Sequence, residues 1–488
     1  MIKYRARVHD KFSIELKMWY YSTSDRLDRF RLENWIFLPA SLDINALSYT
    51  REQFYSDIKN YFRNITPVFG ITELGSVSGQ PEIVPNPLSP MDYLTNSVVN
   101  VVNYPTKQNI AEFEYQIKMF CAIFKSAARE EYNGIKRLSP QSDSERERSG
   151  KFLEILYSVL LSYESIASYL ESCSEKKYYN LCSFGEEFII NLAGIYAGKI
   201  YNYAGASRES AEWMNKINGQ RYRRGYSAFT KEGGYENARL LHRLSLLKKY
   251  VESDLFLSVD KRKSGVLKEQ VWYSVAAGLS MIFATAVAFT FQQKYGNFTM
   301  PLFVALVISY MLKDRIKELV RSVFSSNRKL KYFDNKTLFR VKESRVGLSR
   351  EGFDFVPQSK VPEGILALRN RSALVDMENR ISEESVLFYR NLTCVDGKRL
   401  KETSEYDIEG LNHILLLNFS SFIKKMDNPG QPYNIYEEQT GMVQLLVDKI
   451  YYINLIFQFT SSSGELSRVR YRVAMSRSGI ISVDEITP

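Results

Sequence analysis

The sequence predicts an α+β membrane protein with several domains, and three patterns lead to this fold class. A long stretch near residue 300 lacks charge, the first half of the chain has helical periodicity, and both ends alternate with a period of two. The predicted order is a small α+β module (1–69), a Pro/Gly-rich linker (70–105), a helical bundle (106–260), a two-helix transmembrane hairpin with basic flanks (261–331) and an antiparallel β domain (332–488).

The N-terminal module begins with a half-buried strand. Apolar residues alternate with polar ones from Phe12 to Tyr20, the period of a strand with one buried face. A second strand is expected from Arg29 to Leu38, paired with the first as a hairpin. Thr50 and Gln53 have the spacing of a capping box, so a helix is expected after Thr50.

The next segment is rich in residues that interrupt regular structure, which predicts an extended linker; these residues are Gly75, Gly79, Pro81, Pro85, Pro87 and Pro90.

The region from Thr106 to Asp260 has helical periodicity almost throughout. Apolar stripes over 110–124 and 152–166 predict amphipathic helices, and Ser183 with Glu186 suggests a second capping box that opens another helix. A bundle of four to six cytoplasmic helices follows.

The hairpin is predicted from two uncharged runs. Val271 to Phe291 is 21 residues long, enough to span about 30 Å of hydrocarbon as a helix. Phe298 to Leu312 has only 15 residues, and it spans a bilayer only if its helix continues into polar residues or the bilayer thins locally.

Basic residues on both outer flanks predict the orientation. Lys261, Arg262, Lys263 and Lys268 precede the first run, whereas Lys313, Arg315 and Lys317 follow the second, and the connecting turn has only Lys294. The positive-inside rule therefore predicts a multi-pass protein of the cytoplasmic (inner) membrane, with two spans and both termini in the cytoplasm.

The C-terminal segment returns to a period of two. Alternating residues at 413–419, 451–459 and 469–475, with the turns SSSG (461–464) and SRSG (476–479), predict an antiparallel meander.

No motif in the sequence predicts a cofactor, a metal site or catalysis. Four cysteines have no regular spacing, and three histidines (His9, His242 and His413) lie far apart. The acidic pairs Glu130–Glu131, Glu186–Glu187 and Glu383–Glu384 are expected on the solvated surface, because neighbours in sequence do not share a helix face.

The motif RYRRGY (221–226) begins a basic region with twelve Lys or Arg against five Asp or Glu up to Lys268. Together with the net charge of +10, this predicts contact with anionic lipid headgroups or phosphate. The proposed contact residues are Arg221, Arg223, Arg224, Lys261, Arg262, Lys263, Lys313, Arg315 and Lys317. A solvated surface or a protein contact is the alternative, and nucleic acid is less favoured.

A second basic stripe, Arg468, Arg470 and Arg472, lies on one face of a predicted strand. It is interpreted first as charge that protects an edge strand from unwanted pairing, and second as a docking site for an acidic partner.

These observations favour a membrane-anchored scaffold, sensor or adaptor without catalytic activity, which binds an as yet unknown protein partner. One alternative is an oligomeric membrane-perturbing effector of a bacterial stress or defence system, in which homo-oligomers form in the bilayer. Another is an enzyme of unrecognised type whose site assembles from distant residues.

Overall fold

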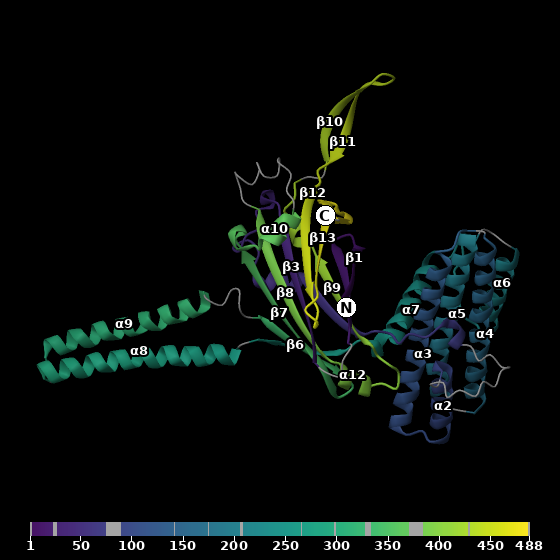
Figure 1. The fold of residues 1–488 in the computed structure, drawn as a ribbon, viewed down its shortest axis with the longest axis horizontal. Coiled ribbons are helices and arrows are strands. Elements are labelled where there is room, and N and C mark those ends of the chain that lie inside the picture. The colour runs from purple at the N-terminus through teal and green to yellow at the C-terminus, as the bar shows by residue number, and fades with distance from the viewer. Residues whose placement is uncertain are drawn as a thin grey trace. The chain divides into compact units, whose positions relative to one another are not determined.

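The computed structural model describes residues 2–22, 27–74, 89–140, 142–173, 175–204, 208–264, 266–296, 299–326, 333–369, 384–427 and 430–486 (Figure 1). Two compact units emerge. The β unit comprises Met1–Arg63, Ser258–Glu405 and Glu409–Pro488, and the helical unit comprises Asn64–Leu257 with Tyr406–Ile408. The helical unit is therefore an insertion in the chain of the β unit.

The β unit contains two large sheets and a small ribbon. The four-stranded sheet has the order β1 (Ile2–Asp10), β2 (Ser13–Tyr21), β9 (Gly410–Asn418), β4 (Ile58–Asn64). The eight-stranded sheet has the order β14 (Gly479–Ile486), β13 (Leu466–Ser476), β12 (Tyr451–Thr460), β3 (Leu27–Leu38), β8 (Ser385–Asp396), β7 (Ser344–Val356), β6 (Asn335–Val341), β5 (Ser258–Lys263). The ribbon pairs β10 (Gly430–Glu437) with β11 (Gly441–Asp448).

Short helices connect these strands; they are η1 (Ala40–Leu42), α1 (Arg51–Asp57), η4 (Gln358–Lys360), α10 (Glu363–Arg369), α12 (Gly397–Glu402) and α13 (Ser420–Ile423). The predicted capping box at the start of α1 is confirmed, with Thr50 and Gln53 bonded reciprocally.

The predicted N-terminal hairpin is wrong. β2 pairs with β1 and β9, whereas β3 pairs with β8 and β12, so β2 and β3 lie in different sheets. A period of two identifies the buried face of a strand but not its neighbours. The N-terminal strands therefore belong to the same unit as the C-terminal ones.

The core of the β unit lies between the two large sheets. Tyr20 of β2 stacks on Phe30 of β3 at 4.6 Å, and Phe62 of β4 packs on Phe339 of β6 at 4.2 Å. The predicted C-terminal meander is present as β12–β13–β14, and Gly464 occupies its first turn with a φ of +83°.

The helical unit consists of long helices around one apolar core. Its elements are η2 (Ile71–Leu74), α2 (Pro90–Asn103), α3 (Lys107–Ile135), α4 (Asp143–Cys173), α5 (Lys176–Ala204), α6 (Arg208–Arg223), α7 (Gly234–Glu252) and η3 (Ser253–Leu255). The second predicted capping box is wrong, because Ser183 lies inside α5 and its hydroxyl donates to the carbonyl of Asn180.

Part of the predicted linker is helical. α2 begins at Pro90, where the ring matches the φ of a first helical residue, and Ser89 caps it. The other linker residues singled out above, from Gly75 to Pro87, lie outside the described residues.

The predicted membrane segment forms two helices side by side, α8 (Val266–Tyr295) and α9 (Met300–Ser326) (Figure 1). Within the described residues, one helix is long and apolar enough to cross a membrane: Tyr273–Tyr295 has a mean hydropathy of 1.8, and 11% of its most apolar window is buried. α9 does not meet this criterion, because charged residues begin at Lys313.

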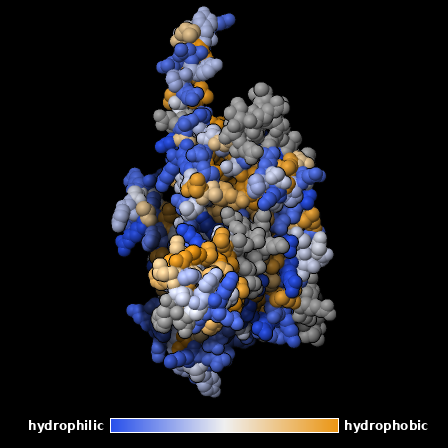
Figure 2. All heavy atoms as spheres, turned by 90° about the vertical axis from the view of Figure 1, so that its left-hand side faces the viewer, coloured by the Kyte–Doolittle hydropathy of each residue, from blue (hydrophilic) through white to orange (hydrophobic). Residues whose placement is uncertain are grey.

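Small side chains lie where α8 meets α9. Ala276, Ser280, Ala305 and Ser309 are buried, and the hydroxyl of Ser309 donates to the carbonyl of Ala284 at 3.3 Å. Larger apolar side chains of both helices are exposed, and Figure 2 shows apolar side chains gathered on the face that carries the hairpin.

Two glycines of α5 differ in their surroundings, which gives a test of packing in the helical unit. A Cβ at Gly185 would lie 2.2 Å from the hydroxyl of Tyr163 and 3.0 Å from Cγ2 of Ile117. We expect Gly185→Ala to lower the free energy of unfolding by about 1–3 kcal/mol, because the added methyl group overpacks the core at this position. Chemical unfolding of the purified chain measures it.

The matched control is Gly198→Ala on the same helix, where no atom apart from the adjacent residues and the local helix backbone lies within 4 Å of the new Cβ. This variant should be more stable by about 0.5–1 kcal/mol, because alanine has less backbone entropy to lose. Equal effects of the two substitutions would contradict the packing described here.

Candidate functional site

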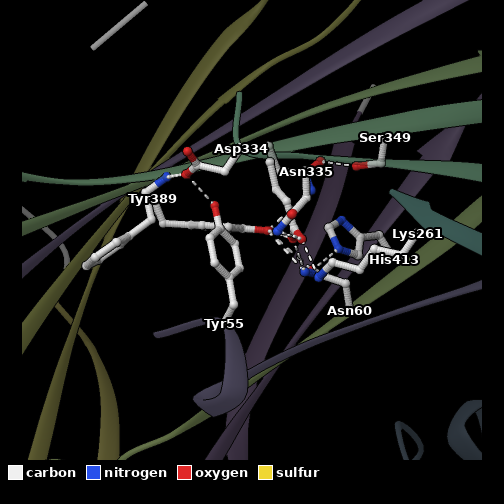
Figure 3. A network of polar contacts seen from close by, with 11 residues as sticks. Tyr55, Asn60, Lys261, Asp334, Asn335, Ser349, Tyr389 and His413 are labelled. Carbon is white, nitrogen blue, oxygen red and sulfur yellow. Dashed lines mark hydrogen bonds and ion pairs between the residues drawn. The ribbon is translucent and has the colours of Figure 1, made fainter. Parts of the chain in front are cut away.

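A polar cluster inside the β unit is the candidate functional site (Figure 3). Two of its members lie near the hairpin in sequence: Lys261 on β5 precedes α8, and Asn335 at the start of β6 follows α9. Its members come from α1, β4 and β9 on one side and from β5, β6, β7 and β8 on the other.

The centre of the cluster is the buried carboxylate of Glu351 on β7. Lys261 of β5 lies 2.5 Å from Oε1, and Asn335 of β6 donates to the same oxygen at 3.1 Å. Asn60 of β4 donates to Oε2 at 2.9 Å, and the hydroxyl of Tyr389 donates to it at 3.3 Å. Both carboxylate oxygens are thus occupied by protein donors.

A chain of hydrogen bonds leads to this carboxylate from the opposite sheet. Because the amide oxygen of Asn60 only accepts, Nε2 of His413 donates to it at 2.7 Å. Nδ1 of His413 then accepts from the hydroxyl of Tyr20 at 3.2 Å. Every donor in the chain points towards Glu351, so the bonds polarise one another.

His413 remains neutral in this position. Its ring is fully buried and stacks on Phe62 at 4.2 Å, and burial lowers the pKa of His413 to about 3. No sequence pattern singled out this histidine beyond its place in an apolar strand.

The outer part of the cluster is a second ion-pair group. Arg51 of α1 lies 2.6 Å from Asp334 and 2.8 Å from Asp354, and Tyr55 donates to Asp334 at 2.8 Å. Burial, together with the neighbouring Asp334 charge, raises the pKa of Tyr55, so the hydroxyl remains a donor. The amide of Phe353 also donates to Asp334, at 3.0 Å.

The cluster is better suited to holding strands together than to catalysis. The carboxylates of Glu351 and Asp334 are bonded on both oxygens, whereas a general base needs a lone pair directed at a substrate. Across the residues that the structure covers, no group of three or more His, Cys, Asp or Glu could hold a metal ion. Cys121, Cys182 and Cys394 are buried and Cys173 is exposed, all as free thiols.

The predicted arginines of RYRRGY have partners within the helical unit. Arg224 lies 2.9 Å from Glu186, Arg221 donates to Asn191 at 3.1 Å, and Arg223 donates to Gln220. Lipid contact by these three residues stays a prediction, but Arg221 and Arg224 are already bound to protein groups.

The expectation that Glu186 and Glu187 are solvated is wrong. Both are buried, and each carboxylate has a cationic partner that compensates its charge. Glu186 pairs with Arg224 and accepts from Tyr226 at 2.7 Å, and Glu187 pairs with Arg243 at 2.6 Å. Burial raises the pKa of Glu186. Glu384 is also buried, against Arg369 at 2.9 Å.

The flanking basic residues of the hairpin are divided between strand and helix. Lys261, Arg262 and Lys263 lie on β5, where Lys261 pairs with Glu351 and Arg262 pairs with Asp260 at 2.6 Å. On α9, Lys313 lies over the ring of Tyr310 at 4.2 Å, while Arg315 and Lys317 are exposed.

The interpretation of Arg468, Arg470 and Arg472 as edge protection is wrong, because β13 lies between β12 and β14. Arg468 donates to Gln458 at 2.8 Å, Arg470 donates to Asn454 and to the carbonyl of Leu368, and Arg472 lies over Tyr452 at 5.3 Å. Docking of an acidic partner by this stripe remains a prediction.

The sequence reasoning missed the polar cluster. One signal was available: on β7 and β8, Ser349, Glu351, Asn391 and Thr393 lie in phase with the buried positions of their strands. A charged residue in that phase indicates a buried partner.

Comparison with known proteins identifies no relative: no family model, curated protein or solved structure matches this chain.

The neutral His413 predicts a pH dependence of stability. Its pKa in the folded chain, about 3, lies below the ordinary value of 6.5. The unfolded chain therefore binds a proton that the folded chain does not, and stability falls as the pH drops below about 6.5, by up to about 1.4 kcal/mol per pH unit. Hydrogen exchange of β2 and β9 amides from pH 7 to pH 5 measures it.

Between pH 7 and pH 5, His413→Gln should lose the fall in stability that comes from His413. His242→Gln, at an exposed position on α7, should keep it. An unchanged slope in His413→Gln would contradict the assignment.

The ion pair at Glu351 gives a second prediction. Lys261→Met should lower the free energy of unfolding by about 1–2 kcal/mol, because a buried carboxylate loses its counter-ion while the half-exposed lysine site limits the cost. Urea titration of the purified chain measures the loss.

Lys263→Met, on the same exposed edge strand, is the matched control and should have little effect. The double variant Lys261→Met/Glu351→Gln should recover part of the loss. No recovery would show that the two residues act independently.

Proposed function

We propose that this chain is a membrane-anchored scaffold or adaptor whose α8–α9 hairpin crosses the bilayer twice, with both termini in the cytoplasm. The observation that carries the proposal is the apolar surface of the hairpin. Side chains such as Ile282 (66% exposed), Phe289 (66%) and Phe303 (62%) expose apolar surface, which has an unfavourable free energy in water and a favourable one in hydrocarbon.

The polar groups of the hairpin support a lipid environment. Hydroxyls along α8 donate to carbonyls one turn earlier, Ser274 to Gln270, Thr285 to Met281 and Thr290 to Ala286, at 2.8–2.9 Å. These groups therefore need no water, which is the requirement for a segment in the hydrocarbon core.

The second span is supported by the length of α9. Its apolar part is short, but the helix continues to Ser326, and 27 residues extend for about 40 Å. Lys313, Arg315 and Lys317 then lie within one helix at the end of the span, and Lys294 stands alone near the turn, which favours a cytoplasmic location for both ends.

A scaffold function is supported by the saturated polar cluster. Glu351 is held by Lys261 of β5 and Asn335 of β6, the strands that precede and follow the hairpin, which suits the attachment of a membrane anchor to a soluble body. A partner protein bound by either unit would thereby be held at the membrane.

The oligomeric effector is a second candidate, and one feature favours it. An apolar groove of about 520 Å³ runs along α8 and α9, lined by residues such as Phe283, Val287, Val304 and Ile308. A helix of another copy would fill such a groove, in which case liposomes containing the protein would conduct ions.

Insertion is tested by a charge at the centre of α8. Ile282→Arg should prevent stable insertion, because arginine at the middle of a span costs about 2.5–3.5 kcal/mol. Gln293→Arg, near the end of the helix, should insert normally. Alkaline extraction of membranes measures both, and loss of the unsubstituted chain from the membrane would refute the anchor.

Orientation is tested in a Cys173→Ser background, because Cys173 is the exposed thiol. A cysteine at Lys294 should react with an impermeant reagent outside intact cells, whereas a cysteine at the exposed Ser462 should not. The reverse pattern would overturn the topology.

A further inference from the structure

Helix α7 has one face in the core of the helical unit and one face without cover. Leu240, Leu247 and Val251 are buried on the inner face. The opposite face carries a stripe at intervals of three and four residues, which consists of Tyr235, Arg239, His242, Leu246 and Lys249. We refer to these five residues as the α7 stripe.

Large apolar groups and cations alternate along the α7 stripe. Tyr235 is 81% exposed and Leu246 is 49% exposed, with Arg239 between them and Lys249 beyond Leu246. The acidic residue nearest in sequence is Glu236, 3.9 Å from Arg239; both side chains are about three-quarters exposed, so the pair is screened by solvent.

The loop before α7 also carries an exposed aromatic ring and an exposed cation. Phe229 is 50% exposed and is followed by the exposed Lys231. The loop has a fixed shape, because Asn237 accepts from the amide of Thr230 at 3.1 Å and donates to its carbonyl at 2.6 Å. Aromatic rings and cations on one exposed helix face are typical of interfacial helices.

We propose that the α7 stripe is a docking surface for anionic lipid, so that the helical unit rests on the bilayer in which the hairpin is anchored. This inference rests on the proposed function, because it takes the membrane to be within reach. Tyr235 and Leu246 enter the headgroup region, while Arg239 and Lys249 contact lipid phosphates.

Two observations favour lipid over other occupants. The stripe has cations and no carboxylate, which complements an anionic surface. Only thirteen residues separate the end of α7 at Glu252 from the start of α8 at Val266, so the chain between them reaches at most about 43–47 Å. This length allows the stripe to reach a bilayer that holds α8.

The α7 stripe also differs from the arginines that the sequence singled out. Arg221 and Arg224 are committed to Asn191 and Glu186 within the helical unit. Arg239 and Lys249 extend from the outward face of α7 and are exposed. The cations available to lipid therefore lie one helix further along the chain.

The test uses the full chain with two substitutions, Cys173→Ser and Leu246→Cys. The introduced thiol is labelled with an environment-sensitive fluorophore, and the protein is reconstituted into vesicles. Vesicles of phosphatidylcholine alone are compared with vesicles that contain about 30% phosphatidylglycerol. We expect a blue shift of the emission in the anionic vesicles only, reversed by about 0.5 M salt.

Arg239→Gln/Lys249→Gln should lower the ratio of docked to undocked protein by about 25-fold, since each cation near an anionic surface contributes about fivefold. The matched control Lys176→Gln/Lys177→Gln removes two exposed cations from the start of α5 and should change the ratio by less than about twofold.

Flotation of the vesicles separates this inference from the proposed function. Protein that floats with both kinds of vesicle but shows no shift would overturn the docking surface and leave the anchor standing. Protein that does not float would refute the anchor itself. An emission shift that depends on protein density and not on lipid charge would assign the stripe to contact with a second copy. An equal loss of docked protein in Lys176→Gln/Lys177→Gln would show that only the net charge of the chain matters. Either result overturns the proposal.

Discussion

The pairing of β5 with β6 is the constraint on which the β unit and its hairpin depend. The register runs from Ser258 opposite Arg340 to Lys263 opposite Asn335, and the amide of Ser264 donates to the carbonyl of Asp334 at 2.7 Å. The chain leaves the sheet at the end of β5 to form α8, and it returns from α9 at the start of β6. Because β5 and β6 are hydrogen-bonded to each other, these two points lie side by side.

The position of β5 gives this pairing a further consequence. The strand has six residues, follows the helical unit at Leu257 and precedes α8 at Val266. It is also the edge strand of the eight-stranded sheet, so its hydrogen bonds to other strands are on one side only. Lys261 adds a side-chain attachment to Glu351 of β7, beyond its immediate neighbour β6.

The polar cluster specifies how the two sheets face each other. An apolar interface between sheets accepts many registers, whereas Asn60, His413 and Glu351 are satisfied only when β4, β9 and β7 are correctly aligned. Charge is used similarly in the helical unit, where Arg224 and Arg243 neutralise buried glutamates of α5. A high count of basic residues is therefore a poor measure of the charge that remains available to a partner.

The sequence by itself determined local features: the strand around Leu16, the capped start of α1, the long helices after Thr106 and the apolar helix Tyr273–Tyr295. Each depends on periodicity or on contacts within a few residues. The tertiary structure alone decided that β2 and β3 lie in different sheets, that β13 is an interior strand, and that Glu186, Glu187 and Glu351 are buried beside cations. Those outcomes depend on partners such as Asn418 opposite Ser13, some four hundred residues away, and the spacing of side chains along one segment carries no information about such partners.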